Sequence, residues 1–294
     1  MVDCIILITC SNNQYEITKE CLESIKSTKY KYKIYLLNHG QDDKLIRKLG
    51  EEVNHFKEFK FGTPITIEMN YGIEKALEES DLVMNINNDI VFHPKTLDMM
   101  ISTMKEKDIL SLCGHILTEK DELKNYDIKG NYDLYYKGIF VSESKVKSWL
   151  PIIFEDFGFD LYSMNIWHRN YFERVGLPDE ETFNQGIYFW DSDLQYRGVL
   201  AGIDTYVASS AIYYHFCGHT ANTNPKAKER LDNMYVAMKI KYRDKFGGNL
   251  KNSKYIGSQH GEDFCFSYQD KLTSEELLKE TIKRNKRNKK YIKR

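Results

Sequence analysis

Three consecutive polar residues, Asn87, Asn88 and Asp89, interrupt an apolar run and are the side chains best suited to chemistry in this sequence. In open α/β sheets, ligands bind at the carboxyl ends of the strands, where such a triplet would lie. Side chains alternate along an extended segment, so Asn87 and Asp89 share one side and together suit a single cation. A simple turn is the alternative interpretation, because Asn and Asp are common turn residues.

The elements that must position this triplet alternate between strand-like and helix-like segments through the first half of the chain. Short apolar runs predict strands at 4–10, 32–37 and 81–87. Apolar residues at helical spacing predict helices at 15–26, 44–53, from about 71, and at 93–107. Such alternation predicts an α/β fold with a mostly parallel sheet covered by helices on both faces.

The second half of the chain is more aromatic and less regular. We expect a hairpin or strand pair at 132–144, a short helix within 166–175 that ends at Gly176, and a helix from Asp191 to Gly202. One or two strands are expected at 203–216. A long helix follows over 225–246, and a last one begins at a capping box, Thr273-x-x-Glu276.

Length and composition indicate a soluble protein with a sizeable core. The chain has 294 residues, of which 41% are hydrophobic and 29% charged, enough for one large domain or slightly more. Its six cysteines form no CxxC pair, which argues against a zinc site or a disulfide framework and fits a reducing compartment. No apolar run approaches the ~20 residues of a membrane span, and the first residues resemble a strand rather than a leader. We therefore expect a cytoplasmic protein.

The charge is unevenly distributed along the chain. Residues 283–294 contain eight Lys or Arg and no acid, so they leave a net charge of −9 on the rest of a chain whose total is −1. A basic tail on an acidic body suggests an anionic partner, either the inner face of a membrane or a nucleic acid. A solvated helix end is the alternative.

Four segments, in their order along the chain, resemble glycosyltransferase family 2, whose members have the GT-A fold. Residues 5–25 resemble the nucleotide-binding start, with a Thr-x-Asn-like turn before a Cys-Leu-x-Ser-Ile helix. Residues 37–40, Leu-Asn-His-Gly, stand where the family has Val-Asp-Asn-Gly. Residues 70–89 resemble the approach to the DxD-type motif, here Asn87-x-Asp89. Residues 172–220 resemble the acceptor half, from Phe-Glu-x-Val-Gly to a strand that ends in His.

The resemblance implies that the donor is a nucleotide-diphosphate sugar, with a UDP-sugar favoured. Asn38 replaces the family's Asp, which contacts the uracil or ribose of the donor, and Asn38 and Asn70 also suit turns. The side chains implied in donor binding are Thr9, Asn12, Asn38, Asn70, Asn87 and Asn88.

The resemblance also implies a divalent cation, Mn²⁺ or Mg²⁺, that neutralises the leaving diphosphate. Asp89 is the expected main ligand, with Asn87 nearer the ribose or a water. His215, at the end of its strand, is the expected imidazole ligand, which would favour Mn²⁺. A core histidine is the alternative role for His215, and His219 is its rival as a ligand.

The acceptor hydroxyl must lose a proton, and Asp191 is the expected general base. It would act from the face opposite the leaving group, so the anomeric centre would invert. Asp191 also suits a helix N-cap, and the two roles are compatible. The family usually has Glu-Asp where this chain has Trp190-Asp191. On the acceptor side, Trp190 suits sugar stacking or core packing, and Asp193 suits helix support or a contact with Arg197.

The sequence thus predicts an inverting, metal-dependent glycosyltransferase of polysaccharide or glycoconjugate synthesis, with a glycan or lipid-linked glycan as acceptor. The expected catalytic domain covers 1–224, divided into a nucleotide-sugar-binding half (1–95) and an acceptor half (96–224). A helical extension, 225–294, carries the basic tail. A degenerate sugar-nucleotide-binding protein and a transferase acting on a nucleic-acid base remain as alternatives. A nucleotidylyltransferase or a nicotinamide enzyme would need an early glycine-rich loop that this chain lacks.

Overall fold

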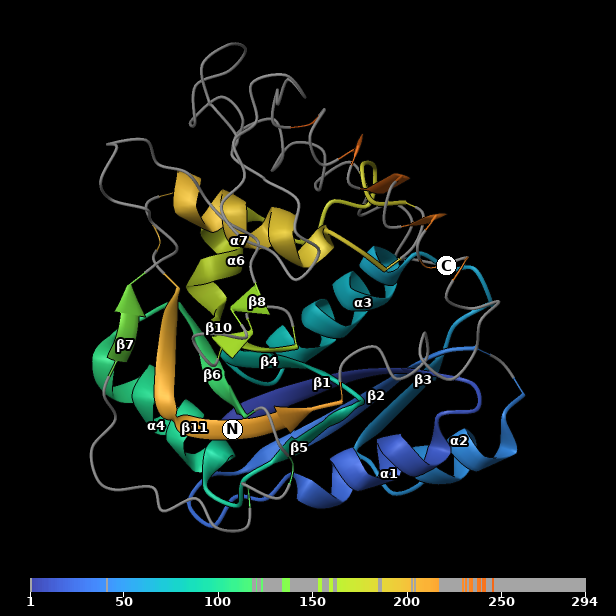
Figure 1. Cartoon of the computed structure of the whole chain (residues 1–294), viewed down its shortest axis with the longest axis horizontal. Helices are drawn as coiled ribbons and strands as arrows, with labels where there is room; N and C mark the ends of the chain where they lie inside the picture. The colour runs from blue at the N-terminus through green and yellow to red at the C-terminus, as the bar shows by residue number, and fades with distance from the viewer. Residues whose placement is uncertain are drawn as a thin grey trace.

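The structure is a computed structural model, drawn in Figure 1. It describes residues 2–40, 42–117, 120, 123, 134–137, 153–154, 159–160, 163–184, 187–201, 203, 205–216, 229, 231, 233, 234, 237, 238, 240, 241 and 245. The described residues form a central sheet with helices on both faces (Figure 1). The mostly parallel α/β architecture expected from the sequence is confirmed.

The first half of the chain alternates strands and helices. Its elements are β1 Cys4–Ser11, α1 Tyr15–Ser24, β2 Tyr32–His39, α2 Lys44–Gly50, β3 His55–Glu58, α3 Ile65–Leu77, β4 Leu82–Asn87, β5 Ile90–Phe92 and α4 Thr96–Lys107.

The later elements complete the sheet and add two helices. They are β6 Ser111–Leu117, β7 Leu134–Lys137, β8 Ile153–Phe154, β9 Phe159–Asp160, β10 Met164–His168, α6 Arg169–Val175, α7 Trp190–Leu200 and β11 Tyr206–His215. The described residues between 229 and 245 are all helical, as expected for part of the helix at 225–246.

The strands run in the order β3-β2-β1-β4-β10-β6-β11-β5, with β7 beside β11. The neighbours β3, β2, β1 and β4 are parallel, whereas β10 runs antiparallel to both β4 and β6. Because the parallel strands share one direction, their carboxyl ends meet at one edge of the sheet. The ends of β1, β2 and β4 therefore gather the polar residues that follow each strand.

Two hydrophobic clusters cover the two faces of the sheet, because successive strand side chains point to opposite sides. Ile5 and Leu7 pack beneath α3, α6 and α7. Ile6 and Ile8 pack with α1, α2 and α4. Figure 1 shows the same division, with α3, α6 and α7 above the sheet and α1, α2 and α4 below it. The direction of any strand residue follows from this alternation.

Several boundaries differ from those expected. The helix within 166–175 begins only at Arg169, because the apolar residues before it form β10, and it ends at Gly176, which has a left-handed φ of 78°. The helix α3 begins at Ile65 rather than near Tyr71. A further strand, β3, lies at the edge of the sheet. A short run of polar and apolar residues does not determine where a helix or strand begins, because the boundary depends on the elements that pack against it.

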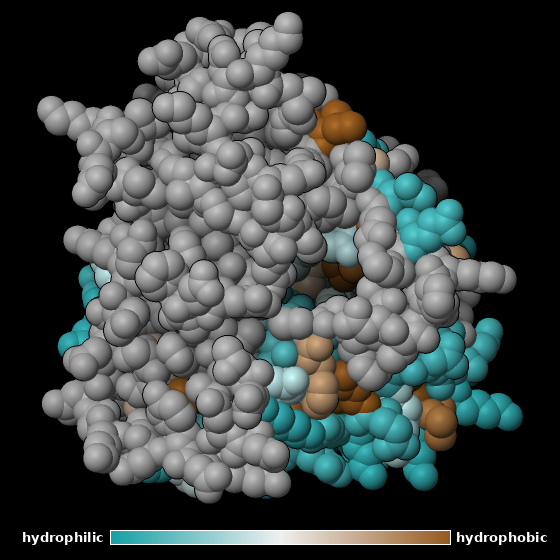
Figure 2. Space-filling view, viewed as in Figure 1, coloured by the Kyte–Doolittle hydropathy of each residue, from teal (hydrophilic) through white to brown (hydrophobic). Residues whose placement is uncertain are grey.

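The described surface on the face in Figure 2 is largely hydrophilic, with smaller hydrophobic areas. Phe61, 71% exposed, is the most exposed of the large hydrophobic side chains in the described residues. Among those residues, no helix combines the length and the apolar character needed to cross a membrane. The basic tail, 283–294, the last expected helix and most of the hairpin at 132–144 lie outside the described residues.

Candidate active site

The end of β4 and the end of β11 bring an acid and a histidine together. Oδ1 of Asp89 lies 3.1 Å from Nε2 of His215, and the two side chains are 15% and 9% exposed. Nδ2 of Asn87 lies 3.5 Å from the same imidazole nitrogen. The backbone N–H of Phe216 donates to the carbonyl of Asp89, at 2.9 Å, and closes the two segments on each other. These three expected residues thus form one cluster at the carboxyl edge of the sheet.

The polar triplet includes a turn, which is the alternative interpretation of the sequence, and the cation site stays a prediction. Asn88 and Asp89 form the turn that joins β4 to β5. The Asn88 amide is buried and donates to Oε1 of Gln14 and Oγ1 of Thr18, at 3.0 and 2.8 Å. These bonds fix the turn to α1 and its entry, and so hold Asp89 in place. The expected contact of Asn88 with a donor stays a prediction.

The chemistry of this cluster fits a divalent cation that also binds phosphate. Among the described residues, no three His, Cys, Asp or Glu side chains gather as a metal site. Asp89 and His215 supply a carboxylate and an imidazole, and magnesium-type sites often use only one or two protein ligands plus substrate phosphates. In this structure the two side chains contact each other directly, with Oδ1 of Asp89 at hydrogen-bond distance from Nε2 of His215.

The expected donor residues divide between the two faces of the sheet. Thr9 is paired in register with Asn87 and has the parity of Leu7, so both point to the face covered by α3. Asn38 has the parity of Leu36 and points to the opposite face, where it is fully buried. Thr9 and Asn87 therefore share a face of the sheet that Asn38 does not.

Asn38 holds the loops that follow β1 and β2. Its Nδ2 donates to the Gly40 carbonyl at 3.2 Å and to Oδ1 of Asn12 at 3.5 Å. A Cβ on Gly40 would lie 2.2 Å from that Asn12 oxygen, so a larger residue would displace the Asn12 side chain. Asn12 and Asn38 thus form one hydrogen-bonded unit at the carboxyl edge, and their contact with a donor stays a prediction.

A contact between a half-buried histidine and a buried glutamate lies beside this edge and was not predicted from the sequence. Nδ1 of His39 lies 2.5 Å from Oε1 of Glu68, whose side chain in α3 is fully buried. Burial raises the pKa of Glu68, and the contact with His39 opposes that rise. The other oxygen, Oε2, has no hydrogen-bond partner within the described part of the chain. His39 points to the same face as Thr9, with the exposed Phe61 ring 6.3 Å away. A histidine at the end of a strand and a glutamate in a helix carry no sequence signal of this pairing.

Asn70 connects α3 to the acceptor half. Its Nδ2 donates to the Pro178 carbonyl at 3.0 Å and to Oε1 of Glu180 at 2.6 Å, and the side chain is buried. These bonds tie α3 to the turn at 178–184. The expected donor contact of Asn70 stays a prediction.

The first turn of α7 carries the three acceptor-side residues. Because α7 begins at Trp190, Asp191 lies within the first turn rather than at the N-cap, and its Oδ1 accepts from the Ser192 N–H at 2.7 Å. Trp190 is 5% exposed and belongs to the core cluster beneath α3. Asp193 is fully buried and accepts from Nε of Arg197 at 2.9 Å, the contact expected from the sequence.

The residue before this turn has an unusual backbone. Phe189 is 7% exposed and has a φ of 67°, a left-handed conformation that is rare for a bulky side chain. Such conformations persist only where the surroundings hold them, and they cluster at functional sites. The packing around Phe189 therefore fixes the backbone that leads into Asp191.

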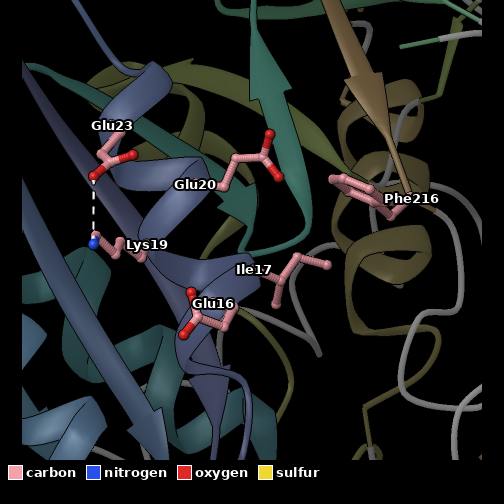
Figure 3. Close-up of a pocket in the computed structure, with 6 residues that line it drawn as sticks. All are labelled: Glu16, Ile17, Lys19, Glu20, Glu23 and Phe216. Atoms are coloured by element: carbon pink, nitrogen blue, oxygen red, sulfur yellow. Dashed lines mark ion pairs between the residues drawn. The ribbon is translucent and has the colours of Figure 1, made fainter.

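A shallow pocket lies between α1 and Phe216, the residue that follows β11 (Figure 3). Glu20 faces Phe216 across it, and Lys120 pairs with Glu20 while its Nζ lies 5.0 Å from the centre of the Phe216 ring. On the other side, Lys19 and Glu23 pair at 3.9 Å. These contacts hold the residue that follows His215. His219 lies outside the described residues.

Comparisons with known proteins concern the family and the fold of the chain. The family model described as glycosyl transferase family 2 matches residues 5–170, more than half of the chain, and ends before α7. No curated protein matches the chain.

Among solved structures, GalNAc-T7 with UDP, GalNAc and Mn²⁺ has a TM-score of 0.52 at 11% identity, covering 73% of this chain and 44% of that one. S. aureus TarS (1–349) with UDP has a TM-score of 0.47 at 12% identity, covering 72% and 59%. The chain thus spans less than two thirds of either structure, and at 11% identity the similarity to GalNAc-T7 concerns the fold alone.

Proposed function

Because this chain belongs to glycosyltransferase family 2, we propose that it transfers a sugar from a nucleotide-diphosphate sugar, with a UDP-sugar favoured, to an acceptor hydroxyl. The observation that carries the proposal is the meeting of Asp89 and His215 beside Asn87. This cluster lies at the carboxyl edge of the sheet, where α/β proteins bind ligands. The fold similarity to a structure solved with UDP and Mn²⁺ supports the same assignment.

In this proposal, Asp89 and His215 hold a divalent cation, with Asn87 beside it. When bound, the cation stabilises the negative charge that develops on the leaving diphosphate. An imidazole in the ligand set favours Mn²⁺ over Mg²⁺. Thr9 and Asn87, on the α3 face, are the side chains best directed to the donor phosphates and ribose.

Asp191 is the proposed general base, and attack opposite the leaving diphosphate would invert the anomeric centre. A positioned base contributes about 10²–10⁴ in rate. Asp191 lies in the first turn of α7 and not at the N-cap position. Phe189, with its left-handed backbone conformation, leads directly into that turn. Trp190 supports the turn from the core, and Asp193 acts through Arg197 rather than on the acceptor.

A ligand panel tests the proposal. We expect UDP-sugars with Mn²⁺ to raise the melting temperature more than GDP-, dTDP- or CMP-sugars, because ligands that bind only the folded state stabilise it by about 2.7 kcal/mol at a hundred times Kd. The best UDP-sugar should then release UDP slowly as water replaces the acceptor. If no nucleotide sugar stabilises the protein, the proposal is wrong. Stabilisation without any UDP release would favour a sugar-nucleotide-binding protein.

The acceptor and the partner of the basic tail belong to the same proposal. A glycan or lipid-linked glycan is the proposed acceptor. Residues 283–294 are proposed to contact anionic lipid, and each Lys or Arg contributes about 1 kcal/mol of binding free energy near such a surface. Co-sedimentation with anionic vesicles, with and without the tail, tests this. Binding instead to RNA or DNA, weakening steeply with salt, would favour the nucleic-acid alternative.

A further inference from the structure

Lys245 places its ammonium between two buried carboxylates of the acceptor half. Its Nζ donates to Oδ2 of Asp179 at 2.8 Å and to Oδ1 of Asp193. The lysine side chain is 3% exposed and both aspartates are fully buried. Burial alone would raise the pKa of Asp179, but Lys245 and Thr182 outweigh it and hold that pKa well below its usual range. Charges so far from water require such partners.

On the helix side, this contact fixes the first turn of α7. The second oxygen of Asp193 accepts from Nε of Arg197, which is itself fully buried. The Arg197 guanidinium also donates to the carbonyls of Val175 and, at 3.0 Å, Leu177. Both oxygens of Asp193 are therefore held, one by α7 itself and one by Lys245.

On the other side, the contact fixes the turn at 178–184. Oδ1 of Asp179 accepts from the backbone N–H groups of Glu181 and Thr182, and Oδ2 accepts from Oγ1 of Thr182 at 2.7 Å. The Phe183 carbonyl accepts from Oγ1 of Thr66 in α3 at 3.0 Å. Lys245 thus joins α7 to a turn that is already tied to α3.

The segment that carries Lys245 docks through one helical face. Met238, Lys241 and Lys245 are helical and spaced by three and four residues, which places them on one side of a helix. Met238 is 1% exposed within the core cluster, and Nζ of Lys241 donates to Oδ1 of Asn184 at 2.6 Å. Nζ of Lys245 also lies 5.5 Å from the centre of the Phe183 ring.

We propose that Lys245 is a positioning residue for Asp191, acting through Asp193 and the first turn of α7. The inference rests on the proposed function, in which Asp191 is the general base. Asp191 lies two residues before Asp193, about 200° around the helix, so whatever fixes Asp193 sets the direction of Asp191. A base displaced by about 1 Å costs on the order of 10²-fold in rate. The segment after the expected catalytic domain thereby completes the acceptor half.

Substitution of Lys245 by Met tests the inference, with Lys241→Met on the same face as the matched control. We expect kcat for UDP release from the stabilising UDP-sugar to fall about ten- to hundred-fold in Lys245→Met. KM, and the Kd and stoichiometry for UDP with Mn²⁺, should stay within twofold, because the donor residues lie on other elements. Lys241→Met should match the wild type throughout. Wild-type kcat per UDP-binding site in Lys245→Met, or a parallel loss of UDP binding, would overturn the inference.

A charge-balanced variant covers the case in which Lys245→Met does not fold, since it leaves two buried carboxylates with one cation. Lys245→Met with Asp179→Asn removes one charge of each sign and the bridge itself. We expect the same loss of kcat, and a wild-type kcat would contradict the inference. The Asp191→Asn variant distinguishes a failure of the positioning role of Lys245 from a failure of the general-base role of Asp191. A fully active Asp191→Asn overturns both assignments, whereas an inactive Asp191→Asn beside an active Lys245→Met overturns only the positioning role.

Discussion

Oδ1 of Asp89 lies 3.1 Å from Nε2 of His215, although 126 positions separate the two residues in the sequence. The strand β11 reaches Asp89 because it runs antiparallel to β5, with His215 opposite Ile90. This acid and this imidazole, with the Asn87 amide beside them, are the side chains that we propose would hold a divalent cation.

Substitution of Asp89 by Asn should strongly reduce metal-dependent turnover. The amide keeps the shape of the carboxylate but loses its charge, and the cation supplies several kcal/mol to the transition state, so we expect UDP release to fall about 10²-fold or more. Asp81→Asn is the control, because Asp81 lies just before β4 and pairs with Arg169 on the surface. Equal activity of the two variants would remove Asp89 from the metal site.

Substitution of His215 by Gln should change the metal preference rather than abolish activity. Loss of the imidazole weakens Mn²⁺ binding more than Mg²⁺ binding, because nitrogen ligands favour the transition metal. We therefore expect the ratio of UDP release with Mn²⁺ to that with Mg²⁺ to fall. An unchanged ratio would assign His215 to a purely structural role.

Substitution of Asp191 by Asn should lower kcat by about 10²–10⁴, the usual contribution of a general base. The affinity for UDP with Mn²⁺ should not change, because Asp191 lies in α7, whereas the expected donor residues lie in β1, β2, β4 and α3 or in the turns after β1 and β4. Calorimetric titration with UDP beside steady-state rates checks both quantities. A variant with wild-type kcat would exclude Asp191 as the base.

Substitution of Glu68 by Gln should alter how stability depends on pH. Burial holds the pKa of Glu68 above that of an unfolded glutamate, so its contribution to stability is fully present at low pH and is lost as pH rises through the folded pKa. Urea unfolding between about pH 4 and 7 should therefore show the wild type losing stability relative to Glu68→Gln as pH rises.

Glu79→Gln is the matched control for this titration. Hydrogen bonds from Lys33 and Tyr35 lower the pKa of Glu79, so its contribution is present at neutral pH and is lost on acidification. Glu79→Gln should therefore lose stability relative to the wild type as pH rises, opposite in sign to Glu68→Gln. The same sign in both variants would show that Glu68 is not destabilised by burial.

Local pattern predicted much of the sheet and the identity of its polar edge. The β-branched run of β1 and the apolar run of β4 form buried strands, and the polar triplet that begins at Asn87 ends β4. Hydrophobic spacing is a property of neighbours in sequence, so it is readable without coordinates. Hydrophobic spacing does not reveal where β10 begins, because the short segment Ile-Trp-His suits a strand or a helix equally.

The fold class, the family and the residue types at the candidate site could be predicted without coordinates, because periodicity and motif order lie along the chain. Which side chains meet depends on the tertiary structure. It paired His39 with Glu68, turned Asn38 away from the face of Thr9, and buried Lys245 between Asp179 and Asp193. Such contacts join residues far apart in sequence, and they depend on strand parity, register and the docking of helices, which no local pattern specifies.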